Sequence, residues 1–148
     1  MNLNVRKAVE ADYDTVARLL ESASLPTLGV ADHISNFLVV ENSNGIVGAI
    51  GLEVYDDVGL LRSAVVDASM QNKGVGSLLY ENLLRHAKTL GVRRLILLTN
   101  TAEKYFEKKG FRRIDQNSVT GPIRQSAEFS GACPSHAACM ELILKEDE

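Results

Sequence analysis

The chain has 148 residues, of which 45% are hydrophobic and 24% charged, a composition typical of one soluble globular domain. Its formal net charge of −3 lacks the basic excess of a general nucleic-acid binder. No apolar run approaches the ~18 residues of a membrane span, and the N-terminus turns polar too early for a signal peptide. We expect a single domain over residues 1–148, located in the cytoplasm, with no nucleic-acid or membrane partner.

The first half of the chain predicts a strand, two helices and an antiparallel meander. Residues 4–23 indicate a short strand and then a helix whose apolar residues recur at helical spacing. Pro26 breaks that helix, and a second short helix is expected over residues 30–37. Two β-rich runs around the turn at 42–45 predict a hairpin, which a third run extends to residue 67.

The second half alternates strands with helices. Apolar spacing predicts a helix over 75–90, with Gly91 at its C-terminal cap. A buried strand (93–99), a short helix (102–109), a strand (111–115), a loop and a final strand (139–145) follow. The strand–helix–strand unit over 60–99 supplies a parallel crossover, so the fold class is α/β with a mixed sheet.

The stretch QNKGVGS (71–77) precedes the long helix and is typical of an anion site. Amides at a helix N-terminus have no partner within the helix, and the helix dipole is positive there. Gly74 and Gly76 allow close approach of the backbone, and Lys73 adds a positive charge. The order of residues fits neither a P-loop nor the dinucleotide fingerprint. On this stretch alone, a turn that binds no ligand stays an alternative.

The six residues 71–76 match every fixed position of the Q/R-x-x-G-x-G/A signature of the GNAT N-acetyltransferases. The later K-K-G-F segment (108–111) is similar to a second motif of that family, and the order of elements agrees along the whole chain. The resemblance implies the GNAT fold, a mixed and mostly antiparallel twisted sheet of six to seven strands flanked by about four helices, splayed between its fourth and fifth strands. It also implies acetyl-CoA as co-substrate and direct acetyl transfer to an amine.

The resemblance implies that the pyrophosphate lies on the amides of residues 71–77 and that the pantetheine arm runs along residues 64–66. The N–H near Val66 would polarise the thioester carbonyl. Phe106 stands where the family has a tyrosine, and Tyr105 lies one place earlier, about 100° away on a helix. We therefore expect Tyr105 to miss the sulfur unless the helix is offset. The expected donor-binding residues are Ala64, Val65, Val66, Gln71, Asn72, Lys73, Gly74, Val75, Gly76, Ser77, Thr99, Ala102 and Phe106.

The acceptor amine needs a base, because amines are mostly protonated near pH 7. Glu53 in the central hairpin is the first candidate, and Glu128 the second; a solvated carboxylate is the alternative for each. Arg62 stands in an apolar strand and needs an anionic partner, either a substrate carboxylate or a neighbouring acid.

The segments 24–27 and 121–140 resemble those of arsenic-resistance N-acetyltransferases and, more distantly, of N-acetylglutamate synthases. That resemblance implies a small amino-acid-like acceptor, with Arg62 and Arg124 receiving its anion and Thr27 and Ser126 donating or accepting hydrogen bonds. It also makes a homodimer an expectation, since many GNAT proteins pair. Acetylation of protein N-termini or lysines, and a CoA-binding module without catalysis, stay open as alternatives.

Two cysteines and a histidine lie close together in CPSHAAC (133–139). Structural zinc takes four ligands at tighter spacing, and free cysteines are mostly small buried residues. We expect no metal at Cys133, His136 and Cys139.

Overall fold

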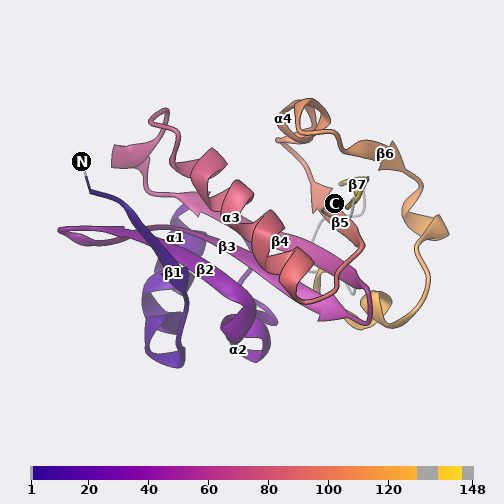
Figure 1. Ribbon diagram of the computed structural model, residues 1–148, viewed down its shortest axis with the longest axis horizontal. Helices are drawn as coiled ribbons and strands as arrows, with labels where there is room; N and C mark the ends of the chain where they lie inside the picture. Colours follow the sequence, from indigo (N-terminus) through magenta and orange to yellow (C-terminus); the bar gives the residue numbers. More distant parts are fainter. Residues whose placement is uncertain (1, 130–136, 145–148) are drawn as a thin grey trace.

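The computed structural model describes residues 2–129 and 137–144 of the chain. Seven strands form one sheet in the order β1-β2-β3-β4-β5-β7-β6 (Figure 1). The strands are β1 (Asn4–Lys7), β2 (Phe37–Asn42), β3 (Gly45–Tyr55), β4 (Val58–Val66), β5 (Arg94–Thr99), β6 (Arg112–Ile114) and β7 (Ala138–Ile143). The α-helices are α1 (Tyr13–Ser22), α2 (Val30–His33), α3 (Val75–Thr89) and α4 (Glu103–Lys108). The α/β fold with a mixed sheet is confirmed.

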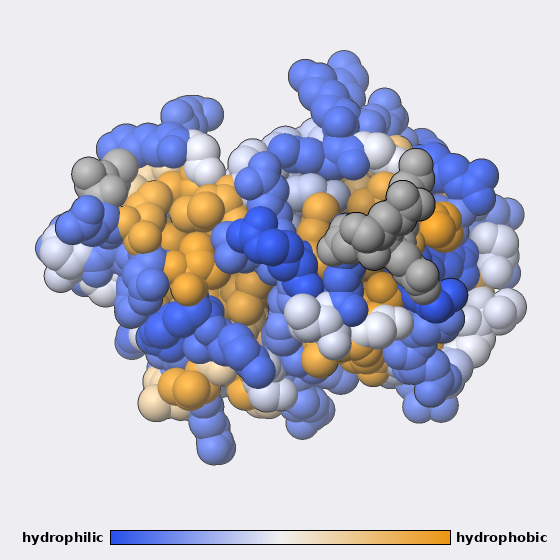
Figure 2. Space-filling model, viewed as in Figure 1, coloured by the Kyte–Doolittle hydropathy of each residue, from blue (hydrophilic) through white to orange (hydrophobic). Residues whose placement is uncertain are grey.

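Helices cover both faces of the sheet because its central strands are apolar on both sides. Leu38 and Val40 of β2 pack under α3, whereas Phe37 and Val39, which alternate with them, pack under α1. A third cluster lies under the loop after β6, around Ile96 of β5. On the face seen in Figure 2, apolar surface gathers at the left, over β1 and beside α3. No helix in the described part of the chain is long and apolar enough to cross a membrane.

The sheet opens between β4 and β5. These strands run parallel and pair only from Val58–Leu60 to Arg94–Ile96, although β4 continues to Val66. On its other side, β4 loses register with β3 between Ala49 and Gly51, and Ser63 adopts a φ of 60° at this bulge. Within the described residues, the β5-facing edge of β4 beyond Leu60 therefore carries no strand partner, as the expected splay between the fourth and fifth strands requires.

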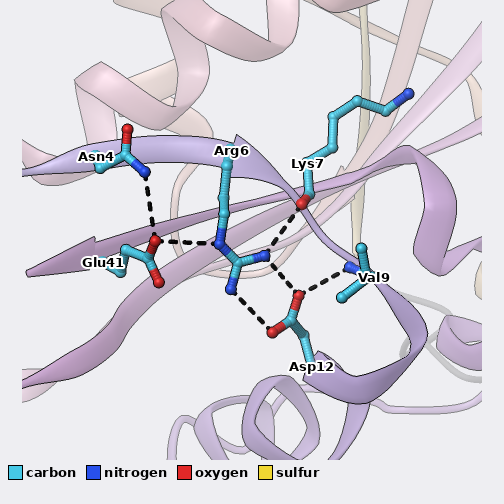
Figure 3. Close-up of polar contacts among 6 residues, drawn as sticks. All are labelled: Asn4, Arg6, Lys7, Val9, Asp12 and Glu41. Carbon is cyan, nitrogen blue, oxygen red and sulfur yellow. Dashed lines mark hydrogen bonds and ion pairs between the residues drawn. The ribbon is translucent and has the colours of Figure 1, made fainter.

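An ion-pair network fastens the first strand to the rest of the sheet (Figure 3). Arg6 of β1 donates to both carboxylate oxygens of Asp12, at 2.8 and 3.0 Å, and to Glu41 of β2 at 3.1 Å. Asp12 also accepts the N–H of Val9 at 2.8 Å. The bonds from Arg6 lower the pKa of both carboxylates, so the network closes the turn before α1 at neutral pH.

A buried carboxylate joins the three strands on the far side of the opening. Glu141 of β7 is 4% exposed and accepts hydrogen bonds from Arg94 of β5 at 2.7 Å and from Arg112 of β6. Burial alone would raise the pKa of Glu141, but the two arginines outweigh it and hold the pKa below its ordinary value. Strand β7 was expected last in the chain, and the structure inserts it between β5 and β6, where Glu141 meets both arginines.

Replacing Glu141 with Gln is expected to lower the free energy of unfolding by roughly 1–3 kcal/mol at pH 7, because two arginines lose their anion. A depressed pKa gives stability that is present above the unfolded-state pKa of Glu, about 4.3, and lost as pH falls through the folded value. Urea titrations at pH 7 and near pH 4 should therefore show a smaller difference between wild type and variant at the lower pH. The control is Glu103→Gln, whose ion pair with Arg113 is largely exposed; an equal loss in both variants would contradict the role of Glu141.

Candidate functional site

Two pockets meet at the opening of the sheet. The first, the apolar pocket, has a volume of about 170 Å³ and is lined by Ile50, Ala64, Val65, Val66, Gly76, Leu79, Tyr80, Ala102, Tyr105 and Phe106. The second, the charged pocket, has a volume of about 140 Å³ and is lined mainly by Pro26, Arg62, Ser63, Ala64, Thr99, Ala102, Phe106 and Glu128. Ala64, Ala102 and Phe106 line both, so a group in one pocket can reach a group in the other across the bulge of β4.

A larger groove of about 740 Å³ lies elsewhere, between the turn before α1 and the residues around α2. Its lining includes Val9, Glu10 and Asp14, and it contains no residue of β4 or α3. We do not place the chemistry there, because the groove is remote from the free edge of β4 and from the glycine-rich loop.

The loop at 71–74 is exposed and leads directly into α3. Asn72 and Gly74 have φ values of 63° and 80°, a left-handed conformation that turns the backbone before the helix begins. A Cβ at Gly74 would meet nothing within 4 Å, and one at Gly76 would meet only Val66, at 3.9 Å. This loop therefore leaves room for an anionic group against the first amides of a 15-residue helix.

The apolar pocket continues from that loop along the free edge of β4. Among the described residues, β5 pairs with β4 only over Val58–Leu60, and the side chains that line the pocket beyond Leu60 are mostly apolar. A thin, flexible ligand with amide groups fits such a pocket, because its amides can pair with the strand while its carbons are buried. The residues present thus fit CoA: residues 71–77 would hold its diphosphate, and residues 64–66 its pantetheine arm.

The residues in and just before α4 divide between the two pockets. Phe106 lines both pockets, and Tyr105, which is 39% exposed, lines the apolar pocket, with its hydroxyl 3.2 Å from Ser77 Oγ. Tyr105 therefore faces the start of α3, not the junction of the two pockets. Thr99 accepts the N–H of Ala102 at 3.0 Å and lines the charged pocket instead of the apolar one.

Arg62 lines the charged pocket but is already held by the protein. The residue is 2% exposed, and its guanidinium makes four hydrogen bonds: to Ser63 Oγ, to the carbonyls of Leu28 and Pro26, and to Glu53 at 2.8 Å. The neighbouring acid that the sequence left open as a partner is thus Glu53. Arg62 holds the loop between α1 and α2 as a wall of the charged pocket. Glycine suits position 29 of this loop because its φ is 86° and a Cβ there would lie 3.2 Å from Arg62 Nη1.

Glu53, the first candidate for the base, lies inside the protein. It is 0% exposed, is not part of the lining of the charged pocket, accepts the hydroxyl of Tyr55, and lies 3.6 Å from His33 Nε2. Burial would raise the pKa of Glu53, but hydrogen bonds from Tyr55, Arg62 and Ser126 and the charge of His33 lower it overall. A carboxylate held ionised by an internal arginine is a weak base and is poorly placed to receive a proton from an acceptor.

Of the remaining acceptor-site candidates, Glu128 lines the charged pocket, and Ser126, Thr27 and Arg124 do not. Glu128 is 6% exposed and lines the charged pocket, and its backbone N–H bonds Ser126 Oγ at 3.2 Å. Ser126 belongs to the buried network around Glu53. Thr27 does not line the pocket, and Arg124 donates to the carbonyls of Gln116 and Val119 and stacks on Phe129. Two further neighbours of the site, Ser63 and Tyr55, carry no sequence pattern that marks them.

Of the three residues considered for a metal in the segment 133–139, the structure describes only Cys139. Cys139 is buried, and burial raises the pKa of its thiol to about 11, which makes it unreactive. Cys133 and His136 lie outside the described residues. Among residues 2–129 and 137–144, no group of three or more potential ligands is placed to hold a metal ion.

Comparison with solved structures finds the same fold in other proteins. The protein Rv2747 from Mycobacterium tuberculosis, solved in complex with CoA, superimposes with a TM-score of 0.80 at 24% identity, covering 96% of this chain and 99% of that one. N-acetylglutamate synthase from Neisseria gonorrhoeae, complexed with CoA and L-arginine, gives a TM-score of 0.81 at 20% identity. This chain is covered to 97% but spans only 34% of that synthase chain.

Sequence comparison agrees. An amino-acid acetyltransferase from Mycobacterium tuberculosis is 31% identical over 134 residues, covering 87% of this chain and 72% of its own length. The family model of the acetyltransferase (GNAT) domain matches residues 33–113, which run from α2 through the glycine-rich loop to β6. The chain therefore belongs to the GNAT family of N-acetyltransferases, whose co-substrate is acetyl-CoA.

Proposed function

We propose that the protein acetylates the free amino group of a small amino-acid-like acceptor bound in the charged pocket. The observation that carries this proposal is the junction of the two pockets at Ala64, Ala102 and Phe106, with a buried carboxylate, Glu128, in the acceptor half. The amino-acid acetyltransferase from Mycobacterium tuberculosis supports an acceptor of this class.

The size of the charged pocket favours a small acceptor over a polypeptide. Its volume of about 140 Å³ corresponds to roughly five water molecules. Its leucines and Phe106 would pack around the aliphatic part of an amino-acid side chain. Ser63, Thr99 and Thr101 offer hydroxyl groups to the acceptor's polar groups. Acetylation of a protein N-terminus, the main alternative, would need an open groove for several residues.

In the proposed mechanism Glu128 receives the acceptor's ammonium group and removes its proton, which frees the nitrogen lone pair for attack. Acetyl-CoA supplies an acetyl group activated as a thioester. The N–H of Val66, on the free edge of β4, donates to the oxygen on which negative charge develops. A thiol with a pKa of about 8.5 is a tolerable leaving group, so no strong acid is needed.

A screen for CoA release across the common amino acids tests the acceptor class. The expected result is CoA release that depends on acetyl-CoA and on one or a few amino acids with a free α-amine, with arsenical and phosphinic analogues included. Mass spectrometry should find one acetyl group added to the amine. Turnover only with peptides beginning in a free N-terminus would contradict the small-acceptor proposal, and CoA binding with no turnover on any amine would favour a non-catalytic module.

Glu128→Gln keeps the shape of the side chain but removes its basicity. We expect kcat to fall roughly 100-fold or more near pH 7, with the dissociation constant for acetyl-CoA unchanged, because Glu128 does not line the apolar pocket. Stopped-flow or thiol-release kinetics and calorimetry measure the two quantities. Glu107→Gln, an exposed position on α4, is the control. Wild-type kcat in Glu128→Gln would remove Glu128 as the base.

A further inference from the structure

Glu53 is a fully buried carboxylate that the proposed mechanism does not use. It lies on β3, outside the lining of the charged pocket. It accepts hydrogen bonds from Arg62 at 2.8 Å, from Tyr55 and from Ser126, and His33 Nε2 lies 3.6 Å away. An ionised carboxylate is costly to bury unless its oxygens are paired, and this one is paired with groups from several elements. Two of these partners, Arg62 and Ser126, lead on to residues of the charged pocket.

The first partner connects Glu53 to one wall of the charged pocket, which we call the loop wall (residues 25–28). Leu25 and Pro26 line the pocket, and Arg62 donates to the carbonyls of Pro26 and Leu28 at 3.2 and 2.8 Å. One guanidinium nitrogen, Nη1, donates both to Glu53 and to the carbonyl of Leu28. The carboxylate therefore orients the nitrogen that holds the loop wall.

The second partner connects Glu53 to the proposed base. Ser126 is 3% exposed, its hydroxyl donates to the carboxylate of Glu53, and its Oγ accepts the N–H of Glu128 at 3.2 Å. Because one hydroxyl can donate and accept at once, Ser126 links that carboxylate to the backbone of Glu128. The short helix Pro122–Gln125, which ends directly before Ser126, also lies against β3 and β4. The segment that carries Glu128 is thus fastened to β3 through Glu53.

The loop between α1 and α2 and the segment that carries Glu128 meet beside Glu53. A Cβ placed on Gly29 of that loop would lie 3.2 Å from Arg62 Nη1 and 3.3 Å from the Cβ of Ala127. It would also lie 3.9 Å from Glu53 Oε2. These distances from one point show that the loop, the guanidinium and the residue before Glu128 pack together around the carboxylate. One buried charge therefore contacts what holds both sides of the charged pocket.

We propose that Glu53 is a positioning residue for acetyl transfer, whose carboxylate acts through Arg62 and Ser126 to hold the loop wall and Glu128 at the spacing the reaction needs. This inference rests on the proposed function, because it takes Glu128 as the base. Glu53 lines neither pocket, so its effect reaches the acceptor only through its partners. A base must lie within hydrogen-bond reach of the proton it removes, and a displacement of about 1 Å can cost ~100-fold in rate.

Glu53→Gln keeps the size of the side chain and removes the charge that holds Arg62. We expect kcat to fall about 10- to 100-fold and the KM for the acceptor to rise, because both sides of the charged pocket shift. The dissociation constant for acetyl-CoA, measured by calorimetry, should stay unchanged, because Glu53 does not line the apolar pocket.

Asp12→Asn is the matched control for that variant. It also removes a buried carboxylate from an arginine, Arg6, but Asp12 lies in the turn before α1 and lines neither pocket. Both variants should melt at a lower temperature than the wild type, because each leaves an arginine without its anion. Assayed below both melting temperatures, only Glu53→Gln should lose activity.

Ser126→Ala tests the link to Glu128 with Glu53 and Arg62 both in place. We expect kcat to fall about 10-fold with the KM for the acceptor nearly unchanged, because the loop wall keeps its contacts. This variant also separates positioning from direct proton removal by Glu53. If Glu53 were the base, Ser126→Ala would keep a kcat near that of the wild type, and Glu53→Gln would lose the fall in rate toward acidic pH. Under the proposal that fall belongs to Glu128 and persists in Glu53→Gln.

Wild-type kcat and KM in Glu53→Gln, or losses no larger than those of Asp12→Asn, would overturn the inference, and so would wild-type kcat in Ser126→Ala. If Glu53→Gln does not fold, Ser126→Ala decides, since it keeps both buried charges. Glu128→Gln, assayed alongside, keeps the two proposals apart. Wild-type kcat in that variant would refute the proposed function, whereas its loss there, with normal kinetics in Glu53→Gln and Ser126→Ala, would remove only the positioning role.

Discussion

The divergence of β4 from β5 is the constraint on which the site depends. A strand in the middle of a sheet normally has both edges paired, and leaving one unpaired and buried is costly. Here β4 loses its partner after Leu60, and the bulge at Ser63 turns Ala64 outward, where it is exposed. A ligand with amide groups can form the missing backbone hydrogen bonds and so offset the free-energy cost of the unpaired edge. Both pockets exist because the strands separate at this point.

The buried pair of Glu53 and Arg62 holds one side of the opening. Two buried charges are costly unless their geometry is good and their other lone pairs and protons are used. Arg62 meets that condition by donating to two carbonyls of the loop between α1 and α2, and Glu53 by accepting from Tyr55. The pair thus ties β3 and β4 to that loop. Its consequence for the charged pocket is that Arg62, which lines that pocket beside Glu128, is paired with a carboxylate of the protein itself.

Much of the fold follows from local sequence patterns. Helix α3 follows from apolar spacing and from Gly91, and the hairpin of β2 and β3 from its Asn-Gly turn. The glycine-rich loop at 71–77 is equally local, because its amides belong to consecutive residues. The insertion of β7 between β5 and β6 has no local signal, since it depends on Glu141 meeting arginines 47 and 29 residues away.

The acceptor side was harder to predict for the same reason. Glu53 and Arg62 each resembled a substrate-facing residue when considered alone, and only their distance of 2.8 Å shows that they satisfy one another. Sequence patterns report which face a residue occupies, whereas hydrogen-bond pairing across the fold decides whether a buried polar group is spent on structure or kept for a ligand.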